Sequence, residues 1–185
     1  TGLAVESGGP ALELGAGTGR VALAIAKAGI DVVGIEPMEP MLEQARERLA
    51  RLSRAARDRV ELRKGDVERL RLRRKFPLVI APFNVWMHLY AREDIERGFA
   101  TMRHHPETGG RFAFDVLLPD PVSLTRAPKK RYSGGEVPNP RDGARYRYSE
   151  YFGHDTVGQI NTEVMTLSNP GQSAKCRVHP TTLRH

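Results

Sequence analysis

The sequence predicts an α/β fold, in which a doubly wound parallel sheet is followed by an antiparallel hairpin. Three observations predict it. An apolar run at residues 11–14 leads into a turn with glycine at every second position and then into an alanine-rich helix, the opening of a βαβ unit. Short apolar runs then alternate with amphipathic stretches as far as residue 116, which is typical of parallel strands joined by helices. Beyond residue 143 the pattern changes to the alternation of antiparallel strands.

The composition is ordinary for a soluble protein. Of the 185 residues, 39% are hydrophobic and 28% are charged, so the chain can bury the core of one domain. No run approaches about 18 apolar residues and no basic-then-apolar leader is present, so we expect no membrane segment and a cytoplasmic location. Cys176 is the only cysteine, which excludes an intrachain disulfide and a cysteine-rich metal site, and we expect no metal.

The first elements follow from apolar runs and glycines. Residues 1–10 are expected to be irregular, and the first strand covers residues 11–14. The helix after the glycine turn covers residues 19–28 and ends at Gly29, which suits the left-handed position after a helix. The second strand, residues 31–35, is apolar almost throughout, as expected of a strand buried on both faces.

The rest of the sheet is predicted in the same way. The second long helix opens at Pro40, because proline is favoured at the first helical position. Gly109 and Gly110 are expected to turn into the last strand of the sheet. The remaining elements are strands at 60–63, 78–81 and 111–116 and a helix near 93–104.

Residues 117–143 contain five prolines, which prevent long regular elements. A loop of this length is usually functional or disordered, and we interpret it as a lid or insertion on the substrate side. Residues 145–152 and 159–167 alternate like two strands of a hairpin, joined by a turn at 155–158.

The turn after the first strand has the pattern E-x-G-x-G-x-G, formed by Glu13, Gly15, Gly17 and Gly19. Glycine allows a tight turn and lets a ligand approach the backbone, and the next helix offers free N–H groups to an anionic group. A dinucleotide-binding fingerprint would place its third glycine where Arg20 stands, which argues against a nicotinamide oxidoreductase.

With Thr18, this pattern resembles the first motif of the class I S-adenosylmethionine-dependent methyltransferases. The resemblance implies that the turn cradles the methionine moiety of S-adenosylmethionine and its carboxylate. The cofactor-binding residues implied here are Glu13, Gly15, Ala16, Gly17 and Gly19.

Two acids follow the next strands. Glu36 stands 17 positions after the last glycine, near the distance at which an acid accepts hydrogen bonds from ribose hydroxyls. Pro37 and Met38 continue this expected cofactor site. Asp66 resembles the acid that bonds the adenine amino group in the family, and the backbone of Val67 would meet the ring nitrogen. An Asx turn or helix cap is the alternative role for Asp66.

The fourth strand leads to the candidate catalytic residues. Pro82 and Asn84 follow it, at the carboxyl end of the sheet where open α/β folds bind ligands, and complete the expected cofactor site. Methyl transfer from a sulfonium is an in-line displacement that needs alignment and exclusion of water, and an amine or hydroxyl acceptor also gives up a proton. His88 is the candidate base, with a packing role as its alternative, and Asp115 is the candidate for orienting the acceptor.

The resemblance covers residues 11–116 and implies the Rossmann-like doubly wound sheet of the small-molecule branch of class I methyltransferases, with the hairpin added. Such families have a helix before the first strand and a helix and two strands at the end. Here ten residues precede the first strand and the chain stops at residues 180–185, about where that helix should begin, so we expect truncation at the C-terminus. The expected organisation is a core at residues 1–116 and, in the same domain, a lid and hairpin at residues 117–185.

The net charge of +7 and the arginines of residues 46–75 raise the question of nucleic acid. Acids are interleaved with these arginines and aromatics are not, and residues 81–84 lack the motif of DNA amine methyltransferases. We expect methyl transfer from S-adenosylmethionine to a small-molecule nitrogen or oxygen acceptor. RNA methylation and a non-catalytic nucleotide-binding fragment are the alternatives, and the oligomeric state is open.

Overall fold

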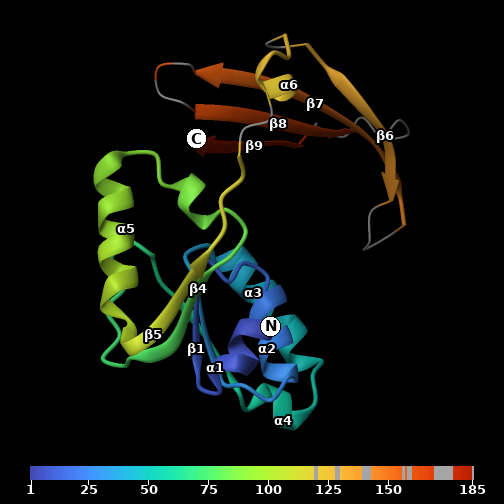
Figure 1. Cartoon of the computed structure of the whole chain (residues 1–185). Coiled ribbons are helices and arrows are strands. Elements are labelled where there is room, and N and C mark those ends of the chain that lie inside the picture. The colour runs from blue at the N-terminus through green and yellow to red at the C-terminus, as the bar shows by residue number, and fades with distance from the viewer. Residues whose placement is uncertain are drawn as a thin grey trace. The chain divides into compact units, whose positions relative to one another are not determined.

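The computed structural model describes residues 1–118, 121–127, 130–138, 143–155, 157, 160–168 and 177–184. Its chain divides into two compact units, Thr1–Val116 and Leu117–His185. Each unit has its own sheet, blue to yellow-green and orange to red in Figure 1.

The first unit is built on a parallel sheet of five strands in the order β3-β2-β1-β4-β5. The strands are β1 (Ala11–Leu14), β2 (Val32–Glu36), β3 (Val60–Lys64), β4 (Phe76–Ala81) and β5 (Pro106–Phe114). Every neighbouring pair is parallel, which confirms the predicted doubly wound sheet. The strand order reverses between β1 and β4, the point at which open α/β sheets bind ligands beyond the carboxyl ends of their strands.

Helices cover both faces of this sheet, with α2 and α5 on opposite sides (Figure 1). They are α1 (Gly2–Ser7), α2 (Arg20–Lys27), α3 (Glu39–Ala50), α4 (Arg54–Arg57) and α5 (Arg92–His104), with a short 3-10 turn, η1 (Val85–His88), after β4. Successive side chains of a strand point to opposite faces. In β1, Leu12 and Leu14 therefore pack in one cluster with Met102 of α5, whereas Ala11 packs in another with Ile25 of α2.

Two parts of this unit differ from the prediction. Residues 1–10, expected to be irregular, contain α1, because Ala4 is buried in the α2 cluster and Gly8 closes the helix at a φ of 64°. Gly109 and Gly110 lie within β5 instead of preceding it. The register between β4 and β5 shifts there and Gly109 has a φ of 78°, so the glycines form an irregularity inside the strand.

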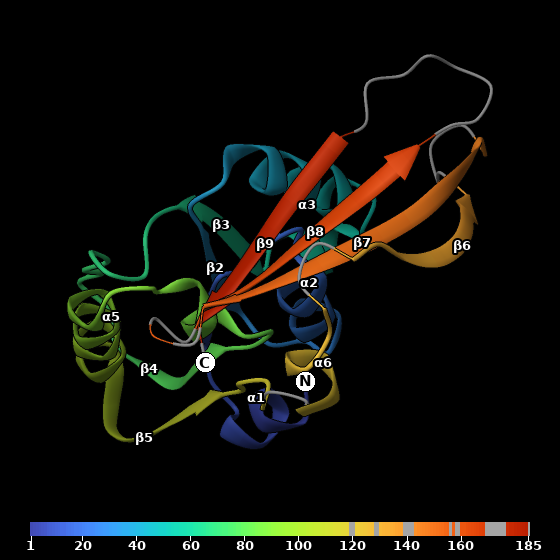
Figure 2. The same cartoon turned by 90° about the horizontal axis from the view of Figure 1, so that it is seen from above.

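The second unit contains α6 (Pro121–Leu124) and an antiparallel sheet in the order β6-β7-β8-β9, seen from above in Figure 2. Its strands are β6 (Tyr132–Pro138), β7 (Arg145–Asp155), β8 (Ile160–Ser168) and β9 (Arg177–Arg184). The predicted hairpin is confirmed as β7 and β8, with Tyr151 opposite Val164. The turn expected at 155–158 lies partly outside the described residues, as does Cys176.

Two strands of this sheet were not expected. β6 forms inside the proline-containing stretch, and β9 forms where the opening of a helix was expected. Both are edge strands, and an edge tolerates proline because one side of the strand needs no ladder hydrogen bond. Pro138 accordingly ends β6 and Pro180 lies within β9. Across the described ranges of both units, no helix has the length and apolar character that a membrane crossing needs.

Candidate functional site

The parallel sheet brings most of the predicted site residues to one edge. Because all five strands run in the same direction, the residues that follow them gather at the carboxyl side of the sheet. The glycine turn follows β1, Glu36 ends β2, Asp66 follows β3, Pro82 and Asn84 follow β4, and Asp115 follows β5.

The glycine turn is held open by its backbone conformation. Gly15, Gly17 and Gly19 have φ values of 72°, 55° and 80°, which disfavour other residues. A Cβ on Gly15 would lie 2.5 Å from Cγ2 of Val85, so η1 packs directly on the turn. A Cβ on Gly17 would meet only Sδ of Met41, at 3.8 Å, so the space beside Gly17 is largely open.

Glu36 connects the end of β2 to this turn. Its side chain is 5% exposed. One carboxylate oxygen accepts the Gly17 N–H at 2.8 Å and the other accepts the Met38 N–H at 3.0 Å. A carboxylate offers about four lone-pair positions, so about two stay available for further donors. Pro37 and Met38 themselves are exposed beside this carboxylate.

Glu13 lies deeper, in the middle of the buried strand β1. Its side chain is 2% exposed and accepts a hydrogen bond from the Ala22 N–H in the first turn of α2. Its Oε2 atom has no hydrogen-bond partner among the described residues. Burial raises the pKa of the Glu13 carboxyl to about 8, against the lowering effects of the Ala22 N–H and of Arg20. Glu13 therefore keeps its proton at neutral pH.

Asp66 begins the segment after β3. It is exposed, and its Oδ1 atom accepts the Glu68 N–H at 2.9 Å, so the Asx turn that was its alternative role is present. The Gly65 N–H donates to the backbone oxygen of Glu36 at 3.2 Å, which places the start of this segment beside β2. The Val67 side chain is half-buried against the α5 cluster.

The turn after β4 is strained. Phe83 and Asn84 both have left-handed backbone conformations, with φ values of 66° and 59°. Asparagine tolerates this conformation, but a bulky residue there costs about 1–3 kcal/mol, which persists where surrounding structure imposes it. The Phe83 ring is 60% exposed, and the guanidinium of Arg20 lies 3.8 Å from its centroid. The Asn84 N–H points to Oδ1 of Asp115 at 3.5 Å, the outer limit of a hydrogen bond.

His88 stands apart from this group. It is the last residue of η1 and is exposed, while Trp86, Met87 and Leu89 are buried and fix the turn in the core. No hydrogen bond or ion pair joins the His88 side chain to Asp115 or to any other described residue. The structure thus places the two candidate catalytic residues on neighbouring connections without a direct contact between them.

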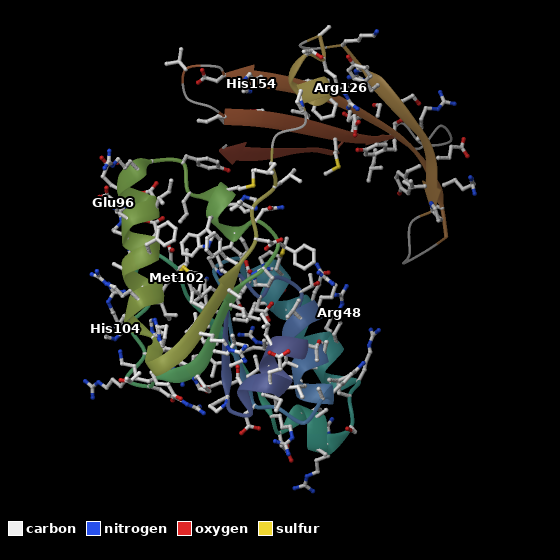
Figure 3. All side chains as sticks on the ribbon, in the orientation of Figure 1. Arg48, Glu96, Met102, His104, Arg126 and His154 are labelled. Carbon is white, nitrogen blue, oxygen red and sulfur yellow. The ribbon has the colours of Figure 1, made fainter. Side chains whose placement is uncertain are left out.

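Sequence reasoning missed three contributors to this edge. Arg20 and Phe83 form the stacked pair described above, and Arg48 of α3 (Figure 3) donates to Oγ1 of Thr18 at 2.6 Å, which ties α3 to the glycine turn. In the sequence, Arg20 was considered only because it stands where a dinucleotide-binding fingerprint would have its third glycine. Nothing in the sequence signals a left-handed phenylalanine. In the residues that the structure describes, no cluster of three His, Cys, Asp or Glu could hold a metal ion.

A cavity of about 580 Å³ lies in the first unit on the α1 and α2 side of the sheet. Its walls come from both of these helices and from β4 and β5, and most of its lining residues are apolar. Pro82 and Asp115, which belong to the carboxyl edge, are among them. The volume falls within the range typical of small-molecule sites.

Comparison with known proteins places this geometry in a family. A family model described as a methyltransferase domain matches residues 11–110. The dTDP-3-amino-3,4,6-trideoxy-alpha-D-glucopyranose N,N-dimethyltransferase of Streptomyces venezuelae is 28% identical over 179 residues, which are 94% of this chain and 68% of that protein.

Two solved structures extend the match. The CcbJ methyltransferase from Streptomyces caelestis has a TM-score of 0.74 and 29% identity, covering 96% of this chain and 71% of its own. The glycopeptide N-methyltransferase MtfA, complexed with S-adenosyl-L-methionine, has a TM-score of 0.63 and 26% identity, covering 95% and 70%. The chain therefore belongs to the methyltransferase-domain family and is a class I S-adenosylmethionine-dependent methyltransferase.

Proposed function

We propose that the chain binds S-adenosylmethionine across the carboxyl ends of β1, β2 and β3 and transfers its methyl group to a nitrogen or oxygen atom of a small molecule. The observation that carries this proposal is the Glu36 carboxylate, which is buried, fixed at the glycine turn, and still has acceptor positions to offer. The other predicted residues take their roles from their positions around it.

Glu36 suits the ribose of the cofactor. A ribose diol presents two hydroxyl donors, and the carboxylate has about two lone-pair positions left after the Gly17 and Met38 N–H groups are bonded. Because both oxygens are already fixed by backbone donors, the carboxylate loses little conformational freedom when it binds the diol.

Asp66 and Val67 suit the adenine. One oxygen of Asp66 holds the Asx turn, and the other faces no described donor, so it can accept from the exocyclic amino group. The Val67 N–H makes no hydrogen bond with the described residues and is available for a ring nitrogen. Pro37 and Met38 are exposed directly after Glu36 and offer apolar contacts.

The glycine turn and Glu13 suit the methionine end. The open space beside Gly17 admits a ligand to the backbone, with Ala16 and Gly15 completing the turn. Free N–H groups at the start of α2, after Gly19, favour the carboxylate. The unpartnered Oε2 atom of Glu13 is a candidate acceptor for the ammonium group once the Glu13 carboxyl has given up its proton, which the approaching positive charge favours.

In the transfer itself, bound S-adenosylmethionine supplies an electrophilic methyl group on a positively charged sulfur. Pro82 and Asn84 shape the turn beside this group and help to exclude water. His88, exposed and without a partner among the described residues, accepts the proton of the acceptor amine or hydroxyl. Asp115 orients the acceptor through its carboxylate.

A small-molecule acceptor is supported by the relatives and by the cavity. The Streptomyces venezuelae relative methylates an amino sugar carried by a nucleotide, according to its name, and MtfA is a glycopeptide N-methyltransferase. The cavity beside Pro82 and Asp115 has the volume of a small-molecule site.

The RNA alternative is weakened by the pairing of the arginines. Many of the cations from α3 to the end of β3 face acids and so contribute less to an external field. The pairs are Arg46–Glu39, Arg54–Asp58, Arg59–Asp31, Arg63–Glu61 and Lys64–Glu39.

Calorimetric titration tests the proposal. S-adenosylmethionine and S-adenosylhomocysteine are titrated into the chain beside NAD, and we expect both sulfur compounds to bind more tightly than NAD. The same chain is then screened against amino sugars for methyl transfer, with a structured RNA at about 150 mM salt as the competing substrate. Tighter binding of NAD, or transfer to the RNA alone, would contradict the proposal.

A further inference from the structure

Helix α5 carries a row of three polar side chains that all bind the segment after β3. Arg97, Thr101 and His105 are spaced four residues apart, so they lie one above another on the same side of the helix and its C-terminal end. Each of them bonds a residue of the segment 68–72, which begins two residues after Asp66. Met102 faces the core, whereas Glu96 lies on the exposed side (Figure 3).

The three contacts are direct. Arg97 donates from Nε and Nη2 to the same carboxylate oxygen of Glu68, at 3.0 Å and 2.8 Å. Oγ1 of Thr101 accepts from Nη1 of Arg71 at 2.8 Å. Nε2 of His105 accepts the backbone N–H of Leu72 at 3.0 Å.

The segment transmits these contacts to Asp66 through its own backbone. The N–H groups of Arg69 and Leu70 both donate to the backbone oxygen of Asp66, at 3.1 Å and 2.9 Å, and the Glu68 N–H donates to its side chain at 2.9 Å. Fixing residues 68–72 therefore fixes the backbone and the carboxylate of Asp66.

His105 can make its contact only when it is neutral. Its ring is completely buried. Nε2 must keep its lone pair to accept the Leu72 N–H, and Nδ1 then carries the hydrogen and donates to the backbone oxygen of Thr101 at 2.7 Å. That bond also satisfies a carbonyl in the last turn of α5. Both ring nitrogens are thus used by one tautomer of the neutral imidazole.

Protonation would break this arrangement. Two N–H groups, Nε2–H and the Leu72 N–H, would then face each other. The protonated ring would also be a buried cation near His104, Arg71 and Lys75. These are the titratable groups that face the ring from α5 and from the segment before β4. Burial is the largest cause that lowers the pKa of His105, and these neighbouring charges add to it, against the raising effect of the Thr101 carbonyl.

We propose that Arg97, Thr101 and His105 form a positioning clamp, which holds residues 66–72 in the shape that binds the cofactor and opens when His105 is protonated. This inference rests on the proposed function for one point, the role of Asp66 and Val67 in adenine binding. The clamp residues touch no ligand themselves and act through the segment.

Amide hydrogen exchange tests the opening step without any ligand. His105→Gln keeps an acceptor for Leu72 and a donor for Thr101 but cannot titrate, so it is the matched control. In the opened state His105 has an ordinary pKa near 6.5. Below that pH, protonation of His105 therefore increases the population of the opened state. From pH 7.5 to 5.5, exchange of residues 66–72 in the natural chain should rise about tenfold relative to His105→Gln. An unchanged ratio over this range would overturn the proposal.

Binding tests the positioning step. Arg97→Gln removes the contact to Glu68 together with a pair to Asp94 on its own helix. Arg92→Gln removes a more exposed pair with Glu96 on the same helix that does not touch the segment, and serves as the control. We expect several-fold weaker binding of S-adenosylhomocysteine in Arg97→Gln only, together with faster exchange in residues 66–72. Equal affinities of the two variants would contradict the clamp. Loss of binding in every variant and in the natural chain would instead contradict the proposed function, while the exchange result would still decide on the clamp.

Discussion

The connections after β2 and β4 begin at the same edge of the sheet but are built differently. After β2, Glu36 is buried and each carboxylate oxygen is bonded to a backbone N–H. After β4, Phe83 is exposed in a strained conformation and His88 has no partner among the described residues. With the roles proposed above, the cofactor side is preorganised by fixed hydrogen bonds, whereas on the acceptor side the His88 side chain has no described partner and is available to a molecule that is yet to bind.

The largest effect is expected on the acceptor side. His88→Gln should slow methyl transfer by about 10²- to 10⁴-fold, because a positioned base contributes that much, and should leave cofactor affinity unchanged. Single-turnover transfer to an acceptor found among amino sugars measures the first quantity, and calorimetry measures the second. A normal rate would assign His88 the packing role instead.

Gly15 joins the two sides, since a Cβ there would lie 2.5 Å from Val85 and the residue has a φ of 72°. Gly15→Ala should destabilise the fold by about 2–5 kcal/mol through overpacking and backbone strain. Gly29→Ala is the control, because Gly29 also has a positive φ, 86°, but no atom lies within 4 Å of its Cβ position. Urea unfolding should show the larger loss at Gly15, and equal losses would exclude the close approach of η1.

On the cofactor side, the buried Glu13 carboxyl should make the stability of the fold depend on pH. Burial raises its pKa in the folded state to about 8, whereas the unfolded value is near 4.5. The folded state therefore binds the proton more strongly, and this contribution to stability is present at low pH and is lost as pH rises towards about 8. Between pH 5 and 8 the free energy of unfolding should fall by roughly 3 kcal/mol more in the natural chain than in Glu13→Gln. Parallel pH profiles of the two proteins in urea unfolding would contradict the raised pKa.

Much of the fold followed from the sequence because it depends on local patterns. The glycine turn, the apolar strands and the alternation after Arg145 each identify an element within about ten residues. α1, β6 and β9 were missed because tertiary packing and edge positions decided them against their glycines and prolines.

The candidate site was predictable as residue types at strand ends, but its contacts were not. The bond from Gly17 to Glu36 joins the turn after β1 to the end of β2, and the pKa of Glu13 depends on what buries it. The left-handed conformation of Phe83 contradicts its local preference, so the sequence around it could not have predicted it. The roles given to the site residues, and the lid role of residues 117–143, stay predictions.

The central claim is that the Glu36 carboxylate binds the ribose diol, and a double-mutant cycle tests it most directly. S-adenosylhomocysteine and its 2′-deoxy analogue are titrated into the natural chain, into Glu36→Ala and into Glu43→Ala, an exposed control on α3. We expect Glu36→Ala to bind S-adenosylhomocysteine at least about tenfold more weakly, since hydrogen bonds to a charged group contribute about 1.5–3 kcal/mol, and to lose the preference for the ribose form. Glu43→Ala should keep both the affinity and the preference. A preference for the 2′-hydroxyl that survives in Glu36→Ala would contradict the claim.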